Sequence, residues 1–117
     1  MILLKEIVEK LKVEPLSSVQ SLDRRVASGY ASDLLSCVLK GAHKDSIWVT
    51  LQSHLNVVAV ASLLGLSGVI ITEGARPDQE TLARAENEGV VLMATPKTTF
   101  TVVAELSSLG VRGETEN

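Results

Sequence analysis

Four polar segments, each following an apolar run, contain most of the side chains that could bind a ligand. Their amides, hydroxyls, imidazole and cations could hydrogen-bond a nucleotide-like molecule or hold a phosphate or carboxylate. The candidate binding residues are Ser32, Asp33, Gln52, His54, Asn56, Thr72, Glu73, Gly74, Arg76, Thr95, Lys97, Thr98 and Thr99. These residue types are also common at helix starts, where they cap unpaired N–H groups. The pattern therefore leaves two interpretations open, a binding site and a set of caps.

Catalytic and metal chemistry have less support. Ser36 or Cys37 could form a triad with His54 and Asp33, but no Gly-x-Ser-x-Gly elbow is present. Cys37 lies in the apolar run 34–39, so we expect it in the core. The chain also lacks both glycine-rich phosphate loops, and its two histidines have no metal-ligand spacing. We therefore expect no cofactor, no metal and no catalysis, with a Ser/His-dependent hydrolase as the last alternative.

The helices and strands that position these residues are predicted from the spacing of apolar residues and from the capping residues, glycines and prolines that begin or end each element. An amphipathic helix is predicted within residues 1–14, with Pro15 ending it. Residues 16–31, around Val19 and Val26, suggest one or two short strands. The remaining helices are expected over 34–40 with Gly41 as the stop, from a cap at Asn56 to Leu64, from Pro77 to Gly89, and from Thr98 or Thr99 to near Gly110; strands are expected over 46–51, 68–72 and 90–95.

The strand ends are regularly spaced. Three predicted strands finish at Thr50, Thr72 and Thr95, 22 and 23 residues apart, and each interval fits one strand and one helix. This alternation predicts a compact three-layer α/β domain with a mainly parallel sheet of about four or five strands flanked by helices. A leucine-rich solenoid is disfavoured because its leucine and asparagine positions are absent. In a parallel sheet, the four polar segments would meet at one edge.

Composition limits the partners. With 117 residues the chain fits one domain over 1–117, ending in a frayed polar tail over 112–117. The net charge is −3 and no basic run occurs, which disfavours nucleic acid. The apolar stretch 57–71 is interrupted by serine and glycine and is too short to span a bilayer. A lone cysteine and a charged N-terminus favour the cytoplasm.

Four stretches carry a resemblance to a known family: Gly29–Ser36, Gln52–Asn56, Thr72–Pro77 and Thr95–Phe100. Together they resemble the DRTGG domain, which is similar to the N-terminal domain of HPr kinase/phosphorylase. Thr72-Glu73-Gly74 matches the Thr-Gly-Gly segment of the family, except that Glu73 replaces a glycine and occupies space that a close ligand would need. Asp23-Arg24 is a candidate for the family's Asp-Arg pair.

The resemblance implies an α/β domain that pairs with itself as a homodimer and regulates or assembles, without established catalysis. Two function classes remain open. One is a sensor module whose strand-end loops bind a small anionic metabolite, a nucleotide or a partner protein. The other is a structural partner in a larger complex, for which redox or hydrogenase enzymes are plausible neighbours.

Overall fold

The computed structural model describes residues 1–16 and 22–113. Within these residues, β2 (Glu14–Pro15), β4 (Ser28–Ala31), β5 (Ser46–Thr50), β6 (Gly68–Ile71) and β7 (Leu92–Ala94) form one sheet. Its spatial order is β2-β7-β6-β5-β4; β4 to β7 are parallel and β2 is antiparallel to β7. A small antiparallel pair joins β1 (Ile2–Leu3) to β3 (Arg25–Val26). The expected mainly parallel α/β sheet is confirmed.

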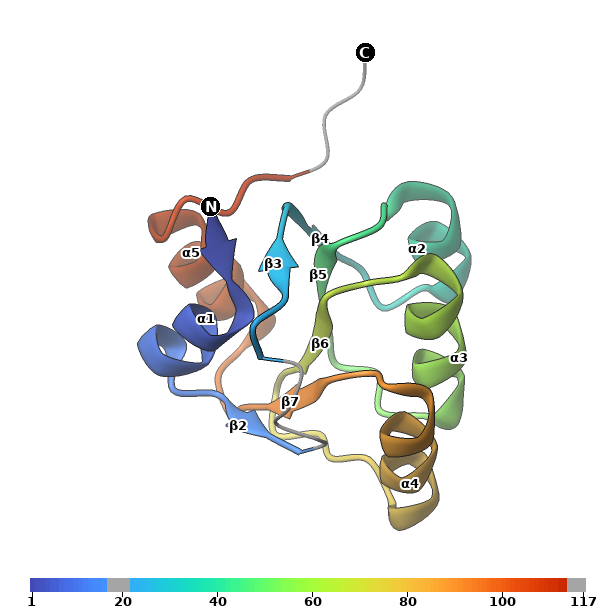
Figure 1. Cartoon of the computed structure of the whole chain (residues 1–117). Coiled ribbons are helices and arrows are strands. Elements are labelled where there is room, and N and C mark those ends of the chain that lie inside the picture. Colours follow the sequence, from blue (N-terminus) through green and yellow to red (C-terminus); the bar gives the residue numbers. More distant parts are fainter. Residues whose placement is uncertain (17–21, 114–117) are drawn as a thin grey trace.

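Helices cover both faces of the sheet (Figure 1). One layer contains α2 (Leu35–Gly41), α3 (Leu55–Leu64) and α4 (Gln79–Glu88), and the other contains α1 (Leu4–Leu11) and α5 (Thr99–Ser108). From α2 to α4 the chain therefore stays on one face, and after β7 it returns to the face that α1 covers. On this second face, α5 lies over β5 and reaches β4.

The strands are apolar throughout because both faces are buried. Ile47, Val49, Ile70 and Met93 pack toward α1 and α5, whereas Trp48, Val69, Ile71 and Leu92 pack toward α2, α3 and α4. Gly68 begins β6 at a tightly packed position, since a Cβ there would lie 2.9 Å from Met93 Cε and 3.3 Å from the Val91 carbonyl oxygen. Close packing at Gly68 therefore fixes the position of β6 in the core.

The structure corrects two predicted helix ends. α1 ends because Lys12 adopts a left-handed conformation (φ 58°), and Pro15 lies beyond it in the edge strand β2. Gly41 is the last residue of α2 rather than its stop, and Ala42 is the C-cap. Glycine fits there because a Cβ would lie 2.6 Å from the Tyr30 ring.

Two further expectations differ in detail. The N-cap of α3 is His54, so Asn56 is not the cap but the residue whose N–H is capped. Cys37 is exposed and not in the core, because Val38 is the α2 residue that faces the sheet. The strands around Val26 and Gly29 are present as β3 and β4, while Val19 lies outside the described residues. In the part of the chain that the structure describes, no helix is long and apolar enough to cross a membrane.

Candidate functional site

The loops that follow β4, β5, β6 and β7 lie at one edge of the sheet. We call this edge the rim; it comprises residues 32–34, 51–54, 72–78 and 95–99. The parallel register aligns Ala31 with Val49, Thr50 with Ile71, and Ile71 with Ala94, so the four strands end at nearly the same level. The parallel sheet therefore brings the four polar segments to the same side of the domain.

The first two loops are joined by Asp33. Its Oδ1 accepts hydrogen bonds from Thr50 Oγ1 and from the Leu51 N–H, both at 2.8 Å. The Gln52 side-chain amide donates to the Asp33 carbonyl oxygen at 3.2 Å. Ser32 Oγ accepts from the Leu34 N–H at the start of α2. Asp33 and Gln52 are thus held together, as the sequence suggested.

The last two loops are also joined. The Glu73 N–H donates to the Lys97 carbonyl oxygen at 2.8 Å, and the Gly74 N–H donates to that of Thr95 at 3.1 Å. Glu73 has a left-handed backbone (φ 62°), and its Oε2 accepts from the Thr99 N–H at 2.8 Å. A crevice is expected between neighbouring strands whose helices cover opposite faces. In this domain, the hydrogen bonds between the loops after β6 and β7 span the position where that crevice is expected.

The three threonines at the strand ends hydrogen-bond groups of the rim loops. Thr50, Thr72 and Thr95 are buried. Thr50 Oγ1 accepts from the Gln52 N–H, Thr95 Oγ1 accepts from the Lys97 N–H, and Thr72 Oγ1 lies 2.6 Å from Thr99 Oγ1. Their regular spacing therefore reflects a repeated structural role, in which a buried hydroxyl satisfies the first polar groups of each turn.

The two cations expected at the rim contact acids of the same chain. Arg76 lies on Glu14 in β2, with nitrogen to oxygen distances of 3.1 and 3.3 Å. Lys97 Nζ lies 2.9 Å from Glu105 and 2.9 Å from the Leu11 carbonyl oxygen at the end of α1. These contacts tie the rim to β2, α1 and α5.

The three long helices that begin at the rim differ in how their starts are capped. Asp78 caps α4 by accepting from the Thr81 N–H at 2.9 Å, and hydrogen bonding to Thr81 lowers the pKa of Asp78, with a smaller contribution from His54. Thr98 caps α5, which also receives the Glu73 carboxylate. α3 begins at His54, whose Nδ1 accepts from the Asn56 N–H at 3.1 Å. Among these three starts, only that of α3 is capped without a carboxylate.

Trp48 holds one of the rim loops in place. It was not among the residues predicted from the sequence. Its side chain is fully buried in β5, and its indole N–H donates to the Ser32 carbonyl oxygen at 2.8 Å. This bond fixes the loop that carries Asp33. The available signal was a tryptophan inside an otherwise aliphatic strand, since a buried indole N–H usually needs an acceptor.

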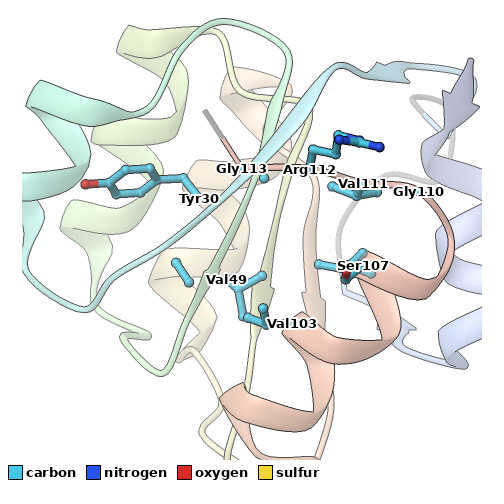
Figure 2. Close-up of a pocket in the computed structure, with 11 residues that line it drawn as sticks. Tyr30, Val49, Val103, Ser107, Gly110, Val111, Arg112 and Gly113 are labelled. Atoms are coloured by element: carbon cyan, nitrogen blue, oxygen red, sulfur yellow. The ribbon is translucent and has the colours of Figure 1, made fainter. Parts of the chain in front are cut away.

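A groove lies on the other side of β4 from α2. It has a volume of about 730 Å³ and is lined by Gly29, Tyr30, Ala31, Val49, Val103, Leu106, Ser107, Gly110, Val111, Arg112 and Gly113 (Figure 2). We call it the β4–α5 groove. The Tyr30 ring points away from it and donates its hydroxyl to the Cys37 carbonyl oxygen. None of these lining residues was predicted from sequence as a site residue.

Fold and rim together define a small parallel α/β domain with a polar strand-end edge. The DRTGG domain model matches residues 6–109, so the chain belongs to the DRTGG domain family. No curated protein sequence matches it.

A similar solved structure is that of the CBS and DRTGG domains of the regulatory region of Clostridium perfringens pyrophosphatase, complexed with the activator diadenosine tetraphosphate. The TM-score is 0.73 at 17% identity; the match covers 88% of this chain and 45% of that chain. The likeness supports the fold.

Proposed function

We propose that this chain is a non-catalytic regulatory module that binds a nucleotide-like ligand at the rim, centred on the start of α3. The observation that carries the proposal is the carboxylate-free cap of α3, set among the converging loops of the rim. Membership of the DRTGG family and the nucleotide complex of the similar regulatory region support the ligand class.

The groups around the α3 start suit the several parts of a nucleotide. The N–H groups of a helix start favour an anion such as a phosphate. Gln52, His54 and Asn56 offer amide and imidazole hydrogen bonds, and the carboxylates of Asp33 and Asp78 are acceptors for ribose hydroxyls or base amino groups. Free phosphate alone would use only the first of these contacts, so a nucleotide should bind more tightly than phosphate.

The proposal is tested by calorimetric titration with diadenosine tetraphosphate, ATP, AMP and inorganic phosphate. We expect saturable binding of at least one nucleotide, and about tenfold weaker binding by His54→Ala, because one hydrogen bond to a charged or polar ligand group is lost. His43→Ala is the matched control, since His43 lies outside the rim, and it should bind normally. No heat from any nucleotide, or an equal effect of both histidine variants, would reject the proposal.

An assembly role is the second candidate, and the surface of α3 favours it. This helix has no charged residue, and Leu63 on it is 75% exposed. Exposed apolar side chains on an uncharged helix suit docking to another protein. A larger complex, redox or hydrogenase-associated, would then recognise α3. Co-purification of a stoichiometric partner with the wild-type chain but not with Leu63→Glu would support this role, and equal recovery with both would contradict it.

We also propose that the module works as a homodimer. Regulation by a small ligand is readily transmitted when two copies share an interface whose geometry the ligand alters. Sedimentation of the purified chain tests this: a dimer is expected, and a monomer at all concentrations would contradict it.

A further inference from the structure

The outward face of α5 carries no charge. Its exposed residues are Phe100, Thr101, Val103, Ala104, Ser107 and Ser108. Phe100 is 85% exposed and Val103 is 41% exposed. The single charged residue of this helix, Glu105, is paired with Lys97. By contrast, the exposed positions of α1 are lysines and glutamates. Loss of charge together with an exposed aromatic ring is typical of the centre of a protein interface.

The β4–α5 groove lies directly beside this face. Val103 belongs to both, since it is exposed on α5 and lines the groove (Figure 2). On the β4 side the lining residues are Gly29, Tyr30 and Ala31, and the Tyr30 ring points away from the groove (Figure 2). Val49, Val103 and Leu106 give the groove apolar walls that suit a large apolar side chain. One surface of the molecule therefore presents a protruding ring next to a cavity able to receive one.

Charges of opposite sign lie at the two ends of this surface. Arg112 is beside the start of β4, where its carbonyl oxygen accepts from the Gly29 N–H at 2.8 Å. The other end of the surface is the start of α5, where the Glu73 carboxylate accepts from the Thr99 N–H at 2.8 Å. Arg112 makes no ion pair with any residue of the ranges 1–16 and 22–113.

We propose that a second copy of this chain docks on this surface about a two-fold axis. The axis places Phe100 of each copy in the β4–α5 groove of the other, and Arg112 of each copy near the Glu73 carboxylate of the other. In a two-fold arrangement each ring fills a groove and each Arg112 faces a carboxylate. Both copies use the same surface, so the assembly ends at two copies. The inference rests on the proposed homodimer and names its surface.

Sedimentation equilibrium on wild type and three variants tests the surface. Phe100→Glu should weaken dimerisation by about a hundredfold or more, because two central aromatic anchors are lost per dimer. Folding should survive, since Phe100 is exposed and an acidic residue suits the first turn of a helix. Arg112→Glu should weaken the dimer by about tenfold and reduce its salt dependence. Leu39→Glu, an equal charge on an exposed site of α2 in the opposite layer, is the control and should dimerise normally.

The outcomes separate the two proposals. A wild-type dimer that Phe100→Glu leaves intact overturns this surface while the homodimer stands. A dimer broken equally by Leu39→Glu overturns it, because the loss would then not depend on the α5 face. A monomeric wild type overturns both the surface and the homodimer, and the groove would then be left to a different partner. The nucleotide titration does not depend on any of these results.

Discussion

At the scale of single residues, the rim is defined by which groups already have partners. Arg76 and Lys97 are ion-paired, Asp78 and Glu73 cap helices α4 and α5, and the start of α3 is left with His54. Glu73 shows how such a contact can offset an unfavourable backbone conformation. A non-glycine residue at φ 62° costs about 1 kcal/mol or more, and its carboxylate offsets that cost by bonding the α5 start.

The stability of the domain should depend on pH through the Asp78 carboxylate. Hydrogen bonding to Thr81 holds the pKa of Asp78 below its ordinary value of 3.8. The stabilisation is therefore present above 3.8 and is lost as the pH falls through the lower folded-state pKa. Asp78→Ala should lower Tm at neutral pH, and the difference from wild type should shrink as the pH drops below that pKa.

Thermal melts by circular dichroism across this range measure the effect. Asp78→Asn is the control, because an asparagine oxygen can still cap α4 without titrating. A gap between wild type and Asp78→Ala that stays constant down to the acid limb would show that the carboxylate does not provide the stabilisation.

At the scale of elements, the strands and helices are set by close packing between layers. Gly68→Ala should destabilise the fold by about 1–3 kcal/mol, because the new methyl group meets Met93 and the Val91 carbonyl in a core without spare volume. Urea denaturation measures this free energy of unfolding. Gly113→Ala is the matched control, since a Cβ there meets nothing within 4 Å, and a similar loss in both variants would contradict the packing argument.

Element positions could largely be predicted from sequence, because helical spacing, glycine stops and the three threonines are local signals. Gly65 and Gly89 do end α3 and α4 in the left-handed conformation. The cap of α3 was misassigned because Asn56 is a common capping type and imidazole is not. The position of Cys37 was wrong because an unbroken apolar run does not reveal which side of a short helix faces the sheet.

Long-range features could not be predicted from one sequence. The ion pairs of Arg76 with Glu14 and of Lys97 with Glu105 depend on where β2 and α5 lie in the fold. The β4–α5 groove is formed by residues 29–31 and 103–113, which become neighbours only because the chain changes face after β7. No local pattern marks either half as part of a cavity.

At the scale of the whole molecule, the domain has two separate surfaces with different chemistry. The rim is polar and lies at the strand ends, whereas the exposed face of α5 is uncharged and borders the groove along β4, which Arg112 lines (Figure 2).

The most direct measurement is a titration of the isotope-labelled chain with diadenosine tetraphosphate, followed by amide and indole NMR shifts. We expect saturable changes in the amides of residues 51–57 and in the Trp48 indole, which bonds the Ser32 loop beneath the rim. Residues of α1, on the opposite layer, should not move. Unchanged spectra, or shifts centred elsewhere than the start of α3, would contradict the account.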